Sequence, residues 1–504
     1  MAPRLVEPKT LIDELLAQQQ SVTAVTRFAE LHEQDALPAQ AQYYRDLIPR
    51  GAPGDGQQYA FEVDLDLCSG CKACVTACHS LNGLDQDEVW RSVGLLHGDS
   101  VQKHVTTACH HCIDPGCLNG CPVLAYEKDP VTGIVKHLDD QCIGCSYCIL
   151  KCPYDVPKYS AERGIVRKCD MCSSRLASGE APACVQACPN EAIRITTIDR
   201  EEVSREFATA TSSAFLPDAP APDYTKPSTK YLSNDRALPG LSRADKGNIE
   251  PSKGHLPLVF FLVLTQMSVG GFLLAGFFSH ASPTTYTVSL AAGLSGLLAS
   301  VFHLGKPLKA WRAFLGLRQS WLSREIIAFG LYAPFSVIVT GSIWLSGVFD
   351  LRVVQLLTVS LSLIGMICVY SSVMVYHDTH RKFWSWPRTT FKFFGTTLLL
   401  GSAIALPEAK FLLMATAVAK LVYEWSESMA ASSEELARTG TLLRGPLRRL
   451  FAARLLLLLL GGVILPFASI PAAAIPIVLI ASELIERHLF FRAVSPDRMP
   501  GLPS

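Results

Sequence analysis

The hydrophobic pattern divides the chain into two halves of different kinds. Up to residue 254 the apolar residues occur in short runs, and four of these alternate with polar residues, at 61–66, 133–138, 164–168 and 192–196. Alternation with a period of two predicts short β-strands. From Leu256 onwards the apolar runs become long enough to cross a hydrocarbon layer about 30 Å thick. The sequence therefore predicts an α+β domain followed by an all-α, polytopic membrane bundle.

About eight membrane-spanning helices are predicted in the second half. The expected spans are Leu256–Phe278, Thr284–Leu304, Ile326–Leu345, Val353–Tyr376, Thr389–Leu406, Lys410–Tyr423, Leu455–Ile470 and Ala472–Phe490. The fifth and sixth are short and contain Lys392 and Lys420, so their signal is the weakest. Glu483 and Glu486, in the eighth, are expected to be helix-end charges near Arg487.

Basic residues gather in every second loop of this bundle. They precede the first span and follow the second, fourth, sixth and eighth, for example Arg318 and Arg448, whereas the opposite loops hold Arg352 and Lys410. Such loops remain on the cytoplasmic side of a membrane. The first residues also lack the apolar core and twin arginine of an export signal. Both ends are therefore expected in the cytoplasm, at a bacterial inner membrane.

Four regions are expected along the sequence. Residues 1–58 form an N-terminal helical extension, in which Thr10 and Asp13 are typical of a capping box. Residues 59–199 form the α+β domain, and residues 200–254, rich in Pro, Ser, Ala and Asp, form a linker. Residues 255–504 form the membrane bundle.

The cysteines are concentrated in the first half. The net charge of the 504 residues is zero, which gives no sign of nucleic-acid binding. All but one of the 17 cysteines lie between Cys68 and Cys188. The exception, Cys368, is expected to be a small apolar core residue of the fourth span.

The concentrated cysteines fall into four groups of four. The groups are Cys68, Cys71, Cys74, Cys78; Cys109, Cys112, Cys117, Cys121; Cys142, Cys145, Cys148, Cys152; and Cys169, Cys172, Cys184, Cys188. The first and third have the spacing C-x2-C-x2-C-x3-C, in which three thiolates wrap one iron–sulfur cubane and the fourth reaches a neighbouring cluster. The spacing therefore predicts [4Fe–4S] clusters.

Zinc and disulfides are the alternatives to iron–sulfur clusters. Zinc sites usually contain two separated C-x2-C pairs or paired histidines, and this spacing is not that of a secreted disulfide framework. His79, His110 and His111 lie beside the cysteines. Because thiolates alone complete each ligand set, these histidines are expected to be surface or hydrogen-bonding residues.

Residues 59–230 resemble the four-cluster iron–sulfur subunit of dimethyl sulfoxide reductase and its relatives in the molybdopterin oxidoreductase superfamily, in the four cysteine groups and in TKPSTKYLS. In that ferredoxin-like family each group lends its last cysteine to a partner group. The resemblance implies these ligand sets: Cys68, Cys71, Cys74 with Cys188; Cys169, Cys172, Cys184 with Cys78; Cys109, Cys112, Cys117 with Cys152; and Cys142, Cys145, Cys148 with Cys121. Cys145 stands where some nitrate-reductase relatives have tryptophan, so four complete cubanes are expected.

The second half resembles the membrane anchor of the same reductases, in FHLGKPLKAW, SWLSREI, VYHDTHRKFW and ERHLFFRAV. That anchor binds menaquinol or a related quinone, and the histidine and glutamate tied to quinol oxidation match His303 and Glu325. A base near the membrane edge suits a reaction that releases protons, and Lys309 is expected to tune both residues through its charge. The alternatives are a helix-capping His303 and an ion pair of Glu325 with Arg324 or Lys309.

The two resemblances together imply an electron-transfer and membrane-anchor component of a molybdopterin oxidoreductase complex in anaerobic respiration. Electrons would pass from the membrane quinone pool through four [4Fe–4S] clusters to a separate catalytic subunit holding molybdenum, or tungsten, bound to pterin. Two alternatives remain open: the same relay run in reverse, from a formate-dehydrogenase-like subunit to quinone, and a redox sensor without turnover. In the best-known members the two halves are separate polypeptides and this module faces outward, so fusion and a cytoplasmic location would depart from the family.

Overall fold

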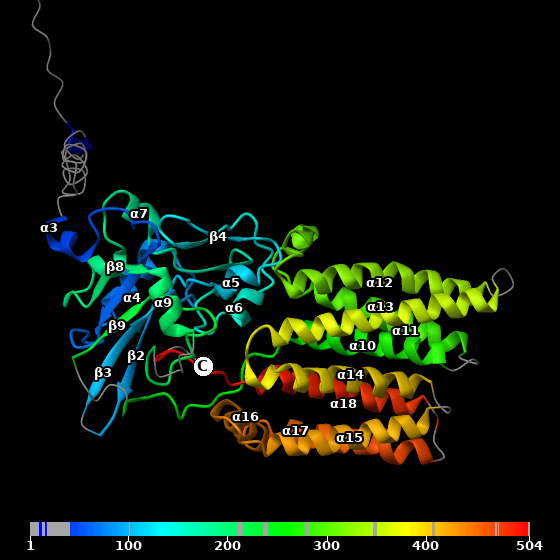
Figure 1. Cartoon of the computed structure of the whole chain (residues 1–504). Coiled ribbons are helices and arrows are strands. Elements are labelled where there is room, and N and C mark those ends of the chain that lie inside the picture. The colour runs from blue at the N-terminus through cyan, green and yellow to red at the C-terminus, as the bar shows by residue number, and fades with distance from the viewer. Residues whose placement is uncertain are drawn as a thin grey trace, which may run out of the picture.

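The two predicted halves lie end to end (Figure 1). The computed structural model describes residues 10–12, 16–17, 41–99, 101–208, 215–234, 240–277, 282–345, 350–405, 409–468, 471 and 473–501. An α+β domain occupies one end and a bundle of long, roughly aligned helices occupies the other. Most of the predicted N-terminal helix, including Asp13, lies outside the described residues.

Two three-stranded sheets form the frame of the α+β domain. In the first, β1 (Gln57–Asp64) lies between antiparallel β8 (Ile193–Asp199) and parallel β9 (Lys230–Leu232). In the second, β2 (Ser92–His97) lies between antiparallel β3 (Gln102–Thr107) and β10 (Ser242–Arg243). Because β9 and β10 belong to the stretch 200–254, that stretch adds strands to both sheets.

Two small hairpins complete the strands of this domain. One pairs β4 (Tyr126–Lys128) with β5 (Val135–His137), and the other pairs β6 (Lys158–Ser160) with β7 (Ile165–Arg167). The four strands expected from the alternating pattern correspond to β1, β5, β7 and β8 and are confirmed.

Short helices follow the cysteine loops. They are α4 (Ala73–Asn82), α5 (Gly116–Asn119), α6 (Tyr147–Lys151), α7 (Ser173–Ala177) and α8 (Ala183–Gln186). Three further short elements, α3 (Ala41–Tyr44), η1 (Arg45–Leu47) and α9 (Arg200–Phe207), pack apolar side chains against the same core. The carboxylate of Asp199 caps α9 by accepting hydrogen bonds from the Glu201 and Glu202 amides.

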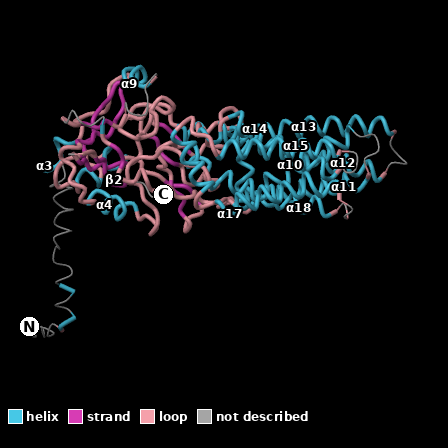
Figure 2. Tube along the Cα trace, turned by 90° about the horizontal axis from the view of Figure 1, so that it is seen from below, coloured by secondary structure: helices cyan, strands magenta, loops and turns pink. Residues whose placement is uncertain are grey.

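The bundle consists of long helices joined by short loops. They are α10 (Leu256–Phe277), α11 (Pro283–Val301), α12 (Trp321–Trp344), α13 (Leu351–His377), α14 (Trp386–Ile404), α15 (Lys410–Ser428), α16 (Glu434–Arg444), α17 (Arg448–Leu459) and α18 (Ala474–Arg492). The shorter segments are η4 (Pro307–Gly316) and η5 (Lys382–Trp384), and η6 (Leu460–Ile464) and η7 (Leu465–Phe467) extend α17. Figures 1 and 2 both show the long helices side by side.

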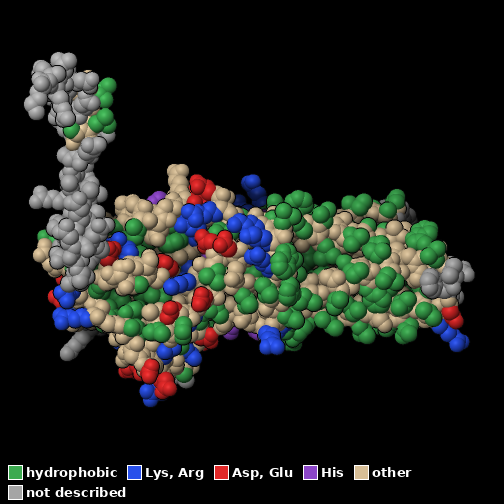
Figure 3. Space-filling model, turned by 90° about the horizontal axis from the view of Figure 1, so that it is seen from above, with side chains coloured by type: hydrophobic (Ala, Val, Ile, Leu, Met, Phe, Trp, Pro, Cys, Tyr) green, Lys and Arg blue, Asp and Glu red, His purple; other side chains and the backbone are tan. Residues whose placement is uncertain are grey.

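Five helices in the described part of the protein are long and apolar enough to cross a membrane. They are α10, α11, α12, residues Arg352–His377 of α13, and Arg448–Phe467, which joins α17 to η6 and η7. Apolar side chains cover the surface of this half, whereas charges gather on the α+β domain (Figure 3). The protein is therefore an integral membrane protein, and five of the predicted spans are confirmed. The other three coincide with α14, α15 and α18, which contain Lys392, Lys420 and Glu483.

The end of the polypeptide returns from the bundle to the α+β domain. The Ser252 amide donates to the Arg492 carbonyl at 3.0 Å, and Arg243 donates to the Arg498 carbonyl at 2.9 Å. Met499 is fully buried in the core of the α+β domain. Gly94 on β2 lies so close to the following turn that a Cβ there would meet the Pro500 carbonyl carbon at 2.2 Å. The two halves are therefore interlocked by both connections between them.

Candidate functional site

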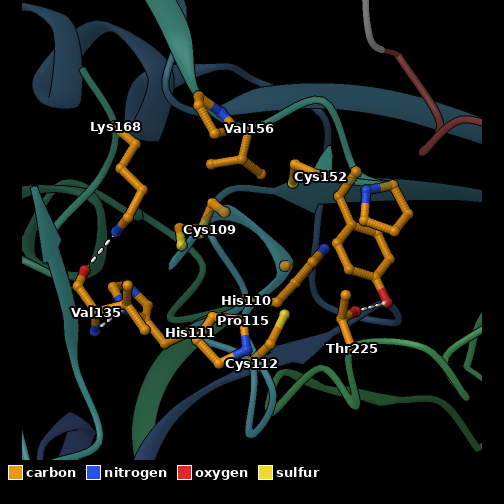
Figure 4. A pocket seen from close by; sticks show the side chains of 15 residues that line it. Cys109, His110, His111, Cys112, Pro115, Val135, Cys152, Val156, Lys168 and Thr225 are labelled. Atoms are coloured by element: carbon orange, nitrogen blue, oxygen red, sulfur yellow. Dashed lines mark hydrogen bonds between the residues drawn. The ribbon is translucent and has the colours of Figure 1, made fainter. Parts of the chain in front are cut away.

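Four cysteines from the second and third groups line one cavity of the α+β domain. Cys109, Cys112, Cys117 and Cys152 surround it, and Lys168 closes one side. In Figure 4 the side chains of Cys109, Cys112 and Cys152 point into a common space. The structure thus brings together one of the four ligand sets that the family resemblance implied.

A second cavity contains another complete set. Cys68, Cys71, Cys74 and Cys188 line it, although Cys188 is more than a hundred residues from the others in sequence. The antiparallel pairing of β1 with β8 brings these distant segments together. Cys71 is exposed to solvent, so this set lies at the surface of the domain.

In the remaining two sets, thiols from different cysteine groups lie close enough to raise one another's pKa. Burial and, next, the neighbouring Cys184 together raise the pKa of Cys78 to about 12. Burial and, next, Cys121 likewise raise the pKa of Cys145 to about 12. In both cases the neighbour comes from another cysteine group, as in the implied pairing of Cys78 with Cys169, Cys172 and Cys184, and of Cys121 with Cys142, Cys145 and Cys148.

Backbone amides point at several of these sulfur atoms. The Ala125 amide lies 3.2 Å from Cys121 Sγ, and the Gly144 amide lies 3.3 Å from Cys142 Sγ. Two other sets have equivalent contacts, from Met171 to Cys169 at 3.4 Å and from Ala192 to Cys188 at 3.3 Å. Hydrogen bonds to cluster sulfur influence the reduction potential of iron–sulfur sites. These loops therefore supply the donors that a bound, negatively charged cluster requires.

Left-handed backbone conformations bend the polypeptide around these sets. Lys72 (φ 63°) and Ser146 (φ 59°) lie between the second and third cysteines of the first and third groups, and Cys172 (φ 50°) is itself a cysteine of the fourth. Non-glycine residues adopt this conformation at a cost and are concentrated at functional sites. The repeated bend turns consecutive thiols towards the same point.

Each of the four sets offers four thiols, the number of ligands that one cubane takes. All 17 cysteines are free thiols. Among the residues that the structure describes, no group of three or more His, Cys, Asp or Glu side chains is arranged to hold a single metal ion. Zinc needs its ligands at about 2.0–2.3 Å from one ion, whereas a cubane divides four thiolates among four irons. The four sets therefore fit iron–sulfur clusters.

The histidines beside the cysteines make hydrogen bonds, and two of them are buried. His110 and His111 are at most 2% exposed. His110 Nδ1 lies 2.9 Å from the Thr229 hydroxyl, and His111 Nδ1 accepts a hydrogen bond from the Val135 amide at 3.1 Å. These contacts hold β5 and the stretch before β9 against the second cysteine group.

The four cysteine sets neighbour one another in series, and this series is called the line of sets below. Three side chains each lie within electrostatic reach of two sets: Tyr126 of Cys148 and Cys117, Lys168 of Cys109 and Cys169, and Arg91 of Cys184 and Cys74. The Cys142 set thus neighbours the Cys109 set, which neighbours the Cys169 set, which neighbours the Cys68 set. Because each of these side chains joins two successive sets, the arrangement suits stepwise electron transfer.

The bundle touches the first set of this line directly. The Lys306 amide donates to the Ile143 carbonyl at 3.0 Å, and the Gly316 amide donates to the Pro122 carbonyl at 2.9 Å. The Ser320 hydroxyl donates to the Gly120 carbonyl at 2.7 Å. The loops of Cys121 and Cys142 therefore rest on the segment that joins α11 to α12.

The three residues expected at a quinol site lie in or beside the segment that joins α11 to α12: His303 near its start, Lys309 within it and Glu325 just after it. His303 follows α11 and its Nδ1 lies 2.6 Å from the Ser300 carbonyl. Glu325, in the first turns of α12, is 5% exposed and accepts a hydrogen bond from the Ser372 hydroxyl of α13. Lys309 is directed to the α+β domain, where its Nζ donates to the Asp140 carbonyl at 2.9 Å. The structure thus places all three residues at the junction and gives each a different partner.

Two residues at the junction were not expected from the sequence. Tyr147, between the cysteines of the third group, is 3% exposed and donates from its hydroxyl to the Val375 carbonyl of α13 at 2.8 Å. Asp378, at the end of α13, lies 2.8 Å from Lys151 Nζ. Tyr147 belongs to the iron–sulfur spacing and Asp378 to the motif VYHDTHRKFW, so the signals were present. The Tyr147 hydroxyl also donates to the Asp378 carboxylate at 3.4 Å, across 231 residues, and neither motif indicates this contact.

Comparison with known proteins supports both halves. Residues 101–198 match the family described as 4Fe–4S dicluster domain, and residues 252–431 match the family described as DMSO reductase anchor subunit (DmsC). The B subunit of the anaerobic dimethyl sulfoxide reductase of Haemophilus influenzae is 36% identical over 206 residues, which are 38% of this protein and 98% of that subunit. This protein belongs to the family of dimethyl sulfoxide reductase B subunits. Its B-subunit region is fused to a DmsC-type anchor.

Other relatives of the B-subunit region belong to different complexes. The hydrogenase-2 operon protein HybA of Escherichia coli O157:H7 is 34% identical over 35% of this protein and 60% of its own length. The nitrate-inducible formate dehydrogenase iron–sulfur subunit of Escherichia coli K12 is 35% identical over 30% of this protein and 62% of its own length. This protein combines an iron–sulfur region of the B-subunit family with a membrane anchor. It is therefore an electron-transfer protein of the membrane.

Proposed function

We propose that this protein takes electrons from quinol at the cytoplasmic edge of its bundle and delivers them to a separate catalytic subunit that holds molybdenum or tungsten bound to pterin. The observation that carries the proposal is the junction, where the loops of Cys121 and Cys142 rest on the segment between His303 and Glu325. Electron transfer weakens steeply with distance, so this contact favours exchange between the two sites. Four [4Fe–4S] clusters, when bound by the sixteen cysteines, supply the single-electron chemistry.

The proposed quinol site uses side chains from two ends of one loop. His303 accepts a hydrogen bond and a proton from one quinol oxygen, and Glu325 passes protons onward. Lys309 contributes positive charge at the same edge of the bundle. Ionisable residues at membrane depth mark such sites more often than they serve packing alone, and Glu325 is almost completely buried.

The catalytic subunit is expected at the opposite end of the line of cysteine sets. The set of Cys68, Cys71, Cys74 and Cys188 lies farthest from the bundle in that line, and Cys71 is exposed there. Exposure of a ligand at a terminal site favours exchange with a partner. Relatives named as components of dimethyl sulfoxide reductase and formate dehydrogenase support a partner of the molybdopterin class.

A direct test is reduction of the purified full-length protein by quinol. A menaquinol analogue added anaerobically should bleach the visible absorbance of the clusters, and a quinone-site inhibitor should prevent it. Dithionite serves as the control, because it reduces clusters without a quinol site. Clusters that respond to dithionite alone would contradict the proposal, and would leave the reverse relay and the sensor as alternatives.

Measured potentials would decide the direction of electron flow. The similarity to a formate dehydrogenase iron–sulfur subunit favours the reverse relay as the second candidate. Potentials near that of menaquinone fit quinol oxidation, whereas four clearly lower potentials fit electron delivery to quinone.

The proposed orientation places the α+β domain and the C-terminal end in the cytoplasm. It rests on the excess of Lys and Arg in alternate loops. A green fluorescent protein fused after Ser504 should therefore fluoresce in bacterial cells, and an alkaline phosphatase fused there should be inactive. The opposite pair of results would place this end, and the α+β domain interlocked with it, outside the cytoplasm.

A further inference from the structure

A buried ionic network lies within the half of the bundle formed by α14, α15, α17 and α18. It consists of eight charged side chains, each at most 5% exposed: Lys392, Lys420, Glu424, Glu427, Arg454, Glu483, Glu486 and Arg487. Charges at membrane depth are costly to bury, and they are candidates for function by default. The members from Arg454 onwards lie beyond residues 252–431, which match the anchor family.

The inner part of the ionic network is tightly paired. Glu483 lies 2.9 Å from Lys420 and 2.8 Å from Arg454, and Arg454 also donates to Glu424 at 2.8 Å. On the side away from the α+β domain, these helices meet in an apolar cluster that includes Leu399, Leu413, Leu458 and Leu479. The paired charges hold α15, α17 and α18 together, and the apolar cluster closes the network towards the far face of the membrane.

The outer part of the network reaches solvent at the end of the bundle that faces the α+β domain. Arg388, near the start of α14, has a side chain 22% exposed and lies 3.1 Å from Glu427. Glu427 lies 2.7 Å from Lys392, whose Nζ is 3.9 Å from Glu486. These contacts form a continuous series from solvent to Glu486.

Polar atoms without a hydrogen bond gather where that series ends, around the ion pair of Glu486 with Arg487 at 3.4 Å. Within the described residues, both carboxylate oxygens of Glu486, Nε and Nη1 of Arg487, and Nε2 of Gln266 on α10 make no hydrogen bond. Gln266 and Arg487 contact each other through Gln266 Oε1 at 3.0 Å. Buried polar groups are normally satisfied by protein or by internal water. This part of the bundle therefore suits a short row of water molecules.

Tyr376 on α13 lies near both the inner end of the series and Glu325 of the proposed quinol site. Its hydroxyl lies within electrostatic reach of both Glu325 and Arg487. Its ring packs 5.7 Å from that of Phe393, over which the Arg487 guanidinium lies at 4.0 Å. Glu325 is buried, so a proton that it accepts needs a polar route to solvent.

We propose that Glu486, Lys392 and Glu427 form the proton route of the quinol site. The proposal rests on the proposed quinol oxidation. Each quinol loses two electrons and two protons and becomes quinone; the electrons go to the iron–sulfur clusters, and the protons leave through Glu325. From there internal water passes them to Glu486, and Glu427 releases them beside Arg388, whose side chain is 22% exposed. Lys392 holds the two carboxylates of the route in register.

Proton release and cluster reduction can be measured together to test this route. The full-length protein in anaerobic membrane vesicles is mixed with a menaquinol analogue, while cluster absorbance and a pH indicator are followed. Glu486→Gln and Glu427→Gln should each slow both signals at least about tenfold, the scale of losing one proton-transfer group. A small weak acid such as azide should restore the rate, because it can carry protons along a hydrated route.

Glu424→Gln is the matched control, since this carboxylate is buried in the same helix as Glu427 but pairs with Arg454 and not with a member of the route. It should react at the normal rate. Normal rates in folded, cluster-containing Glu486→Gln and Glu427→Gln would overturn the route, and so would slow rates that azide does not restore, which indicate a structural network. If Glu486→Gln does not fold, the rates of Glu427→Gln, at the outer end of the series, decide whether the route is correct. Normal rates in Glu325→Gln and His303→Ala would instead show that the quinol site itself lies elsewhere.

Discussion

Reduction of the clusters by a quinol analogue should fall at least about tenfold when Glu325 is replaced by Gln or His303 by Ala, the scale of losing one positioned proton acceptor. Glu325→Gln preserves the shape of a side chain that is 5% exposed and can still accept the hydrogen bond from Ser372. It removes the charge that would take up a proton. Both proteins should insert in the membrane with their clusters intact. The rate of cluster bleaching after anaerobic mixing measures the effect.

A carboxylate at the same edge of the bundle provides the control. Glu434 begins α16 and pairs with Lys246 at 3.1 Å and Arg438 at 3.4 Å, away from the junction. Glu434→Gln should reduce its clusters at the normal rate. If Glu325→Gln and His303→Ala also do so, the assignment of the quinol site is wrong.

Exchange of Cys145 for Ser should remove about one iron from a protein that otherwise holds about sixteen, four in each of four cubanes. Cys145 packs against both the bundle core and the core around the Cys142 set. Loss of this ligand should leave a three-iron cluster with a new electron paramagnetic resonance signal. Because this set lies at the junction, reduction of the other clusters by quinol should also slow. Iron and acid-labile sulfide analysis measure the first effect.

Cys368 is the matched control for this exchange. It is the remaining cysteine, fully buried in α13 among apolar side chains. Cys368→Ser should therefore retain about sixteen irons and the spectrum of the unaltered protein. About eight irons in the unaltered protein, or a substantial zinc content, would contradict four cubanes.

The iron–sulfur half could be predicted closely because its information is local. Thiol spacing specifies a ligand loop within about ten residues, as in Cys142 to Cys152. The strands before these loops alternate clearly, and β1, β5, β7 and β8 were found where expected. The exchange of the fourth cysteine between groups is a long-range feature, and it was supplied by the family resemblance.

The interior of the bundle could not be predicted in the same way. Glu483 and Glu486 were expected to be helix-end charges, yet Glu483 is fully buried between α14, α15 and α17. A hydropathy pattern counts charges along one helix but does not show which neighbour compensates them. Lys392 and Lys420 weakened the fifth and sixth predicted spans for this reason, although their partners lie in α15 and α18.

The junction was predicted only in part, for a related reason. His303 and Glu325 stand out because ionisable residues are rare in apolar runs. The hydrogen bond from Tyr147 to α13 joins a ligand loop to a helix 228 residues later, and no periodicity reports such a contact.

The burial of Met499 in the α+β domain has a consequence for biosynthesis. Domains generally fold as they leave the ribosome, starting from the N-terminal end. Here residues that follow the last helix of the bundle complete a core that begins more than four hundred residues earlier, against β2, whose Val93 lines the cavity of Cys68. The terminal cluster site therefore closes only after every helix of the bundle has been made. A polypeptide released early by the ribosome would lack Met499, so the core beside its Cys68 site would remain open and distinguish it from a finished copy.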